Sequence, residues 1–141
     1  MTVEDLQSYL ATYLNPYIAS RSTGPVPLTA MSVDQFYTND YELPAKNCTI
    51  FLDPSAEEFE DLTMSTRDAK LPVAIYVFVQ GATEAQLRAR ARGYMYAVLD
   101  CIADHPDFMR IESRDVFEGV EGKPDIKAGK VLAIFQYEEV I

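Results

Sequence analysis

The sequence predicts an α+β fold, in which a mostly antiparallel β-sheet carries two α-helices packed on one face. One observation is the pair of segments that meet at Gly81: residues 71–80 are almost all strand formers, and residues 83–102 have the composition of a helix. Another is the order of elements along the chain, which is helix, strand, hairpin partner, strand, helix, strand, strand. The chain has 141 residues, a common size for one domain, so we expect residues 1–141 to form a single α+β domain.

The N-terminal segment has the pattern of an amphipathic helix. Thr2 and Asp5 resemble a capping pair, in which each side chain accepts a hydrogen bond from the backbone amide of the other residue. Apolar residues then recur at helical spacing on one face, namely Val3, Leu6, Tyr9, Leu10, Tyr13, Leu14 and Tyr17. We expect a helix from Val3 to Leu14, with Pro16 disrupting its last turn.

Two segments rich in glycine and proline separate the periodic parts of the chain. Residues 20–46 contain only scattered apolar residues, so we expect a long surface loop with one short strand near residues 31–37. A second loop is expected at residues 118–129, between strands at residues 110–117 and 130–140. We expect both loops to be mobile in the free protein.

The middle of the chain predicts three strands. Residues 48–52 form the first, which stops at an Asp-Pro pair. Residues 57–68 fit either a helix start or a strand, and we favour a strand over residues 59–67, because residues 68–70 then form the loop of an antiparallel hairpin. The partner strand, residues 71–80, is apolar on both faces and is expected at the centre of the sheet.

Thr83 and Gln86 form a capping box, so we expect the second helix to span Glu84 to Ala103 and to end before His105. One stripe of this helix is apolar and is expected to face the sheet: Leu87, Ala91, Tyr94, Val98, Cys101 and Ile102.

The opposite face of this helix is unusual because its side chains are mostly small, with Asp100 as the main charge, where a solvated face normally carries Lys, Glu and Gln. Glycine inside a helix costs about 1 kcal/mol relative to alanine. Gly93 on this face therefore needs a reason, such as the close approach of another backbone. We expect an oligomer interface, most simply with another copy of the chain, at Ala85, Ala89, Gly93, Tyr96 and Asp100.

The charge of the chain limits its partners. Its 22 acidic and 12 basic residues give a net charge of −10, which argues against tight nucleic-acid binding. Arg88, Arg90 and Arg92 are spread over both edges of one helix and form no single basic patch. No segment approaches the roughly 20 apolar residues of a membrane-spanning helix, so we expect no membrane partner.

The sequence predicts no catalytic, cofactor-binding or metal-binding residues, and hence no enzyme and no cofactor. His105 is the only histidine, and it follows a helix end. The acidic run from Asp53 to Asp61 lacks the glycine and the spacing of a calcium loop. Residues 119–124 lack the ending of a phosphate-binding loop and the helix that should follow it. Cys48 and Cys101 are expected to be reduced core residues, although a fold that brought them together would allow a disulfide.

The order of elements resembles that of small structural proteins of tailed bacteriophages and prophages. It is most similar to the tail terminator, or tail-completion, group. The head-tail joining proteins are the second most similar group. The resemblance begins with an amphipathic helix at residues 3–14, a proline-rich connection at residues 20–46 and an apolar strand at residues 73–79. It continues with a helix that carries Leu87, Tyr94 and Val98, and with a closing strand pair that ends in residues 130–140.

The resemblance implies a virion protein that assembles in the cytoplasm of the bacterial host. Members of this group form rings, typically hexameric, that cap the tail tube and receive the head, and they have no catalytic residues. The partners implied are other copies of the chain and other tail or head-tail connector proteins. An acidic surface is compatible with a channel through which DNA must pass without binding.

Two other classes remain open. One is a small α+β ligand-binding or enzyme domain that acts as a dimer, with a site built from Tyr76, Tyr94 and Arg90 across the sheet. The other is an adaptor that binds another protein through its acidic surface. The mass in solution separates the three, because they predict rings, dimers and monomers respectively.

Overall fold

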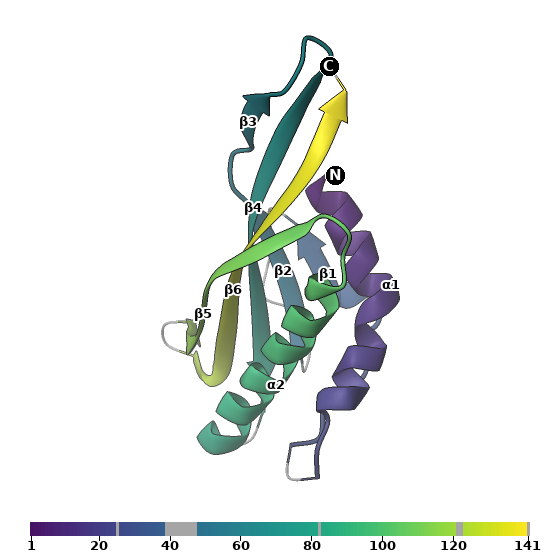
Figure 1. Ribbon diagram of the computed structural model, residues 1–141. Coiled ribbons are helices and arrows are strands. Elements are labelled where there is room, and N and C mark those ends of the chain that lie inside the picture. The colour runs from purple at the N-terminus through teal and green to yellow at the C-terminus, as the bar shows by residue number, and fades with distance from the viewer. Residues whose placement is uncertain (25, 39–47, 82, 121–122, 141) are drawn as a thin grey trace.

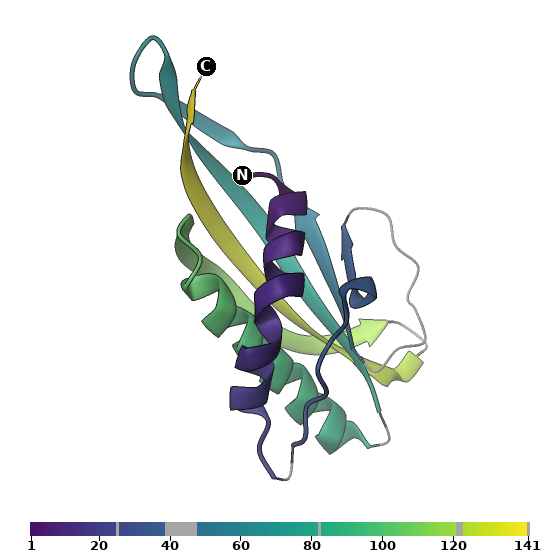
Figure 2. The ribbon, with the colours of Figure 1, turned by 90° about the vertical axis from the view of Figure 1, so that its right-hand side faces the viewer.

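The computed structural model describes residues 1–24, 26–38, 48–81, 83–120 and 123–140. Over these residues two α-helices lie side by side on one face of a sheet (Figure 1, Figure 2). The predicted α+β class is confirmed. The elements are α1 (Val3–Arg21), a 3-10 turn η1 (Val33–Gln35), β1 (Phe36–Thr38), β2 (Cys48–Pro54), β3 (Glu58–Asp61), β4 (Thr66–Gln80), α2 (Glu84–Ala103), β5 (Phe108–Val120) and β6 (Lys123–Val140).

The sheet has the strand order β1-β2-β4-β6-β5 within the described residues, and β3 adds to β4 off this path. β1 and β2 are parallel, and the other pairs are antiparallel. β4 lies between β2 and β6, which confirms its predicted central position. Its apolar character on both faces follows from this place, because a central strand is covered on both sides.

The core lies between the helices and the nearer face of the sheet. Alternate residues of a strand point to the same face, and in β4 these are Val73, Ile75, Val77 and Val79, all fully buried. Against them pack the buried stripes of α1 and α2, including Leu6, Leu10, Leu14, Leu87 and Val98. A smaller cluster on the far face joins Phe51, Phe78, Ile126 and Ala128.

One part of the sheet projects beyond the helices. β4 and β6 pair along their whole common length, from Thr66 opposite Val140 to Gln80 opposite Ile126. β2 stops opposite Val73, and β5 stops opposite Phe135, so the start of β4 is flanked only by β3 and the end of β6. We call this projection, residues 58–71 and 136–140, the arm (Figure 1).

The predicted end of the first helix at Leu14 is wrong, because α1 continues to Arg21 with Pro16 inside it. Proline removes one backbone hydrogen bond. Ile18, only 1% exposed, extends the buried stripe by another turn. Burying a side chain of this size contributes about 2 kcal/mol, which offsets much of the cost of the proline.

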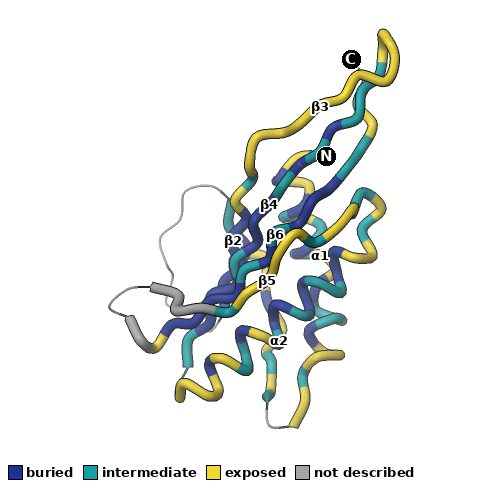
Figure 3. Tube along the Cα trace, turned by 60° about the vertical axis from the view of Figure 1, so that its left-hand side comes forward, coloured by how far each residue is buried: buried dark blue, intermediate teal, exposed yellow. Residues whose placement is uncertain are grey.

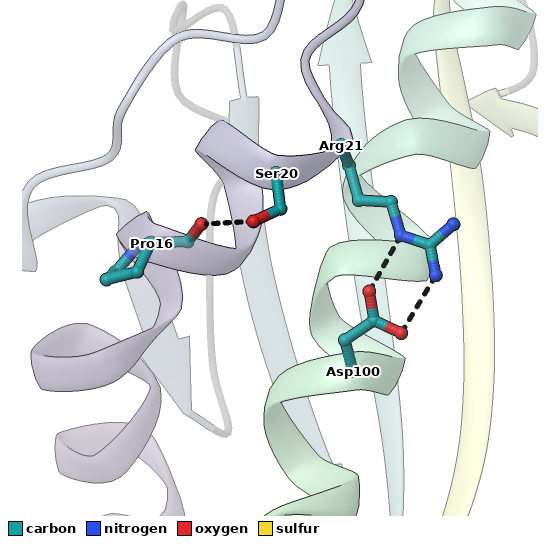
Figure 4. Close-up of polar contacts among 4 residues, drawn as sticks. All are labelled: Pro16, Ser20, Arg21 and Asp100. Atoms are coloured by element: carbon teal, nitrogen blue, oxygen red, sulfur yellow. Dashed lines mark hydrogen bonds and ion pairs between the residues drawn. The ribbon is translucent and has the colours of Figure 1, made fainter.

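Side chains also hold the last turn of α1 in place (Figure 4). The Ser20 hydroxyl donates to the Pro16 carbonyl at 3.2 Å. The Arg21 guanidinium donates to both carboxylate oxygens of Asp100 on α2, at 2.7 and 2.9 Å. The helix thus ends where its partner helix supplies a charge.

The predicted hairpin between β3 and β4 is present, but its turn lies at residues 62–65, so the predicted loop at residues 68–70 is wrong. The Thr63 hydroxyl accepts hydrogen bonds from the backbone amides of Ser65 and Thr66, at 3.2 and 3.0 Å. A hydroxyl therefore closes this turn where glycine or asparagine is the usual signal. Residues 68–70 pair instead with β3 on one side and β6 on the other.

Most of the predicted loop at residues 118–129 is also strand. Residues 118–120 belong to β5 and residues 123–129 to β6, while residues 121–122 lie outside the described residues. Ile126 to Gly129 are buried against β4, which explains why this glycine-containing stretch stays extended. The predicted bounds of α2 are confirmed. Of the strand expected near residues 31–37, only the end is strand, as β1 from Phe36, while residues 33–35 form the 3-10 turn η1. Residues 39–47 of the predicted first loop lie outside the described residues.

Candidate interaction surface

The groups with potential chemistry have structural roles. His105 packs edge-on against Tyr9 and Phe135, with ring centroids 4.5 and 5.6 Å away. Its Nδ1 accepts a hydrogen bond from the Asp107 amide at 3.0 Å. Burial lowers the pKa of this imidazole, so the neutral form is favoured.

Both cysteines are free thiols in the core, as expected. Burial raises the pKa of Cys101 to about 12 and that of Cys48 further, so neither thiol is activated as a nucleophile. The acidic residues 57–61 lie exposed along and just before β3. Among the described residues, no three His, Cys, Asp or Glu side chains are grouped to hold a metal ion.

The residues proposed for a ligand site do not converge. Tyr76 stacks on Phe78, on the sheet face turned away from the helices. Tyr94 is buried on the helix side, where its hydroxyl donates to the Thr29 carbonyl at 3.0 Å. Arg90 points to the carbonyl of Gln80. The pocket that these residues would form across the sheet is absent from the described part of the chain.

An open groove of about 340 Å³ runs between the end of α1, the turn after it and α2. Its lining residues come from all three parts: Ser20, Arg21, Thr23, Val26, Ala89, Arg92, Gly93 and Tyr96.

Local hydrogen bonds fix the connection that forms one wall of the groove. Thr23 and Val26 form an isolated β-bridge, which turns the chain back toward α2. The Ser22 hydroxyl accepts from the Leu28 amide at 2.9 Å. The Tyr94 hydroxyl accepts from the Thr29 amide at 2.8 Å. The wall is therefore built by the protein itself and does not depend on a partner.

The small residues predicted as an interface fall into three groups. Ala85 is exposed, while Ala89, Gly93 and Tyr96 are half-buried and line the groove. Asp100 lies beyond the groove, paired with Arg21. A Cβ added to Gly93 would lie 3.1 Å from Cδ1 of Leu28. The close approach that Gly93 permits is therefore made by a side chain of its own chain.

The groove is basic although the chain is acidic. Two guanidinium groups lie near the Tyr96 ring, those of Arg21 at 5.5 Å and Arg114 at 5.3 Å from its centroid. The hydrogen bonds to Asp100 raise the pKa of Arg21, which stays charged. Arg92 is exposed on the rim. Sequence reasoning missed Arg21 and Arg114, because one lay beyond the predicted helix and the other is placed by a distant strand.

The arm has a different surface. Four large apolar side chains are exposed there: Phe59 at 49%, Leu62 at 49%, Met64 at 101% and Val140 at 78%. Figure 3 shows β3 and the turn after it as exposed throughout. Alternating residues around Met64 gave a strand signal, but only the register of β4 with β6 places them beyond the body of the molecule.

Comparison with protein-family models gives no match, and comparison with curated proteins gives none. Solved structures do match this fold. One is a chain of the virion of a native gene transfer agent particle, which aligns over 95% of this chain and 90% of that chain with a TM-score of 0.55 and 15% identity. The similarity shows a common fold over nearly the whole length of both chains. Neither described helix is long and apolar enough to cross a membrane.

Proposed function

We propose that this chain is a structural protein of a phage-like virion. The observation that carries the proposal is the fold shared with the gene transfer agent virion chain over 95% of this chain. The lack of a site with convergent catalytic groups in the described residues agrees with a structural role. More narrowly, we propose a tail terminator or head-tail joining protein that forms a hexameric ring at the end of the tail tube, contacts other tail or connector proteins, and assembles in the host cytoplasm.

The face of α2 predicted from the sequence supplies one side of the ring contact in this proposal. It comprises the exposed Ala85, the groove residues Ala89, Gly93 and Tyr96, and Asp100 beyond them. A groove on one copy and a different surface on the next make a heterologous contact, which closes into a ring when the rotation between copies allows it.

Mass in solution and negative-stain imaging test the proposal. Rings are expected from the purified chain. Stable dimers support the small ligand-binding or enzyme domain instead, and a monomer at all concentrations supports an adaptor.

A substitution in the groove tests the interface separately. Ala89→Glu places a charged side chain in the groove without touching the core and should dissociate the ring. Thr12→Glu, on an exposed position of α1 outside the groove, is the control and should leave it intact. Gly93 is less suitable for this test, because a side chain there also displaces Leu28 within the same chain.

A further inference from the structure

We propose that the arm of one copy docks into the basic groove of the next copy of the same chain. This docking rests on the proposed function, because it requires that copies of the chain associate. It adds that the surface that meets the groove is the arm. The contact is heterologous: each copy offers its arm to one neighbour and its groove to the other.

Exposed apolar side chains mark the arm as a contact surface. Among the described residues, seven large hydrophobic side chains are exposed, and four of them lie on the arm. Concentration of apolar surface on so few residues is typical of an interaction site. Met64 at the tip is fully exposed, and a methionine side chain adapts well to an irregular groove.

The charges of the two surfaces are complementary. The arm, residues 58–71 and 136–140, contains six acidic and two basic residues, a net charge of 2 − 6 = −4. Arg67 is already paired with Glu139, at 3.0 Å. The groove is lined by Arg21 and Arg92, and the Arg114 guanidinium lies 5.3 Å from the centroid of the Tyr96 ring. Arg21 is paired with Asp100. An acidic arm that approaches this groove replaces repulsion between two acidic molecules with local attraction.

The positions of the surfaces require two molecules. The arm lies at one end of the structure, beside the C-terminus, and the end of α1 and the start of α2 lie at the other (Figure 1, Figure 2). β4 and β6 run without a break from the body into the arm, so the arm cannot fold back onto its own groove. A contact between opposite ends joins copies in one direction, as a ring requires.

The tip of the arm is preorganised for docking. The Thr63 hydroxyl binds the amides of Ser65 and Thr66, and the Leu62 amide donates to the Thr66 carbonyl at 3.1 Å. These bonds order the turn in the absence of a partner. Less conformational entropy is then lost on binding.

Complementation between two defective variants tests the proposal. Met64→Ser damages only the arm, and Arg92→Glu damages only the groove. Each variant alone should associate at least about tenfold more weakly than the unmodified chain, because Met64→Ser removes the apolar tip of the arm and Arg92→Glu reverses a charge that faces the acidic arm. Mixed together, they should form 1:1 dimers, because one intact arm meets one intact groove. Met109→Ser, at an exposed methionine on β5, is the matched control and should form normal rings.

The outcomes separate the two proposals. If Met64→Ser still forms rings, docking by the arm is wrong, while the proposal of a ring is unaffected. A monomeric unmodified chain overturns both. Failure of the mixed variants to form dimers overturns the pairing of arm with groove.

Cross-linking gives an independent reading. In a chain carrying both Met64→Cys and Ala89→Cys, oxidation with copper(II) phenanthroline takes two electrons and two protons from each thiol pair and should give a ladder of covalent multimers. Neither single variant should give a ladder. The native thiols of Cys48 and Cys101 are buried and do not compete. Equal products from the double and single variants contradict the proposal.

Discussion

The imidazole of His105 lies between the rings of Tyr9 and Phe135 and is held by the Asp107 amide. Two carboxylates, Asp107 and Asp5, favour its protonation, but burial outweighs them, and its pKa in the folded protein is below the ordinary value of 6.5. The unfolded chain therefore binds this proton more readily than the folded chain.

The free energy of unfolding should consequently decrease as the pH is lowered below 6.5. The contribution of neutral His105 is complete above pH 6.5 and is lost as the pH falls from 6.5 toward the pKa of the folded state. Because the chain has one histidine, its proton NMR signal reports this pKa directly. His105→Phe should remove the part of the pH dependence that lies just below pH 6.5. A signal that titrates at or above 6.5 would contradict the assignment.

Gly93 and Leu28 should be energetically coupled. Gly→Ala inside a helix normally adds about 1 kcal/mol to the free energy of unfolding. Here the new methyl group would lie 3.1 Å from Leu28 Cδ1, so much of that gain should be lost to crowding. In a Leu28→Ala background the full gain should return. Urea denaturation of the four proteins measures the coupling, and additive changes would show that Leu28 moves aside freely.

At the scale of elements, α1 keeps a proline that weakens it. Replacing Pro16 with Ala restores a backbone donor and relieves the clash with the preceding turn, while the unfolded chain gains entropy. We expect a net increase of roughly 2 kcal/mol in the free energy of unfolding. Thermal unfolding measures it. Pro27→Ala, in the connection outside any helix, is the control and should give no increase.

The sequence predicted those elements whose signals are local. α2 was placed to the residue because its cap and its apolar stripe both lie within it. The end of α1 was missed because its last turn is stabilised by contacts that Ile18 and Arg21 make with residues distant in the sequence. The turn of the β3–β4 hairpin was missed because a threonine hydroxyl closes it, a weaker signal than glycine.

The candidate site was predicted only in part, for a similar reason. Ala89, Gly93 and Tyr96 share one face of a helix, which spacing alone reveals. That α1 and Leu28 would cover part of this face, and that Arg114 would reach Tyr96, depends on how separate elements pack. The arm depends on the relative lengths of paired strands, which no local pattern encodes.

At the scale of the whole molecule, charge is distributed unevenly. The chain as a whole has a net charge of −10, but its groove is basic. The groove holds only a few arginines, and one of them, Arg21, is paired with Asp100. Arg90 turns toward the Gln80 carbonyl and does not join this group. The long-range field therefore repels polyanions, while the groove attracts an acidic surface at short range.

This distribution leads to a prediction about DNA. Each phosphate that a protein neutralises adds about 0.9 to the slope of log affinity against log salt. The groove offers too few free cations for more than a small slope, and the net charge opposes approach. We expect no measurable binding of duplex DNA at physiological salt in a fluorescence anisotropy titration, for monomer and ring alike. Arg92→Glu should leave that result unchanged. Tight binding with a steep salt dependence would mean that assembly creates a basic surface absent from the single chain, and a ring that held DNA in this way would oppose its passage.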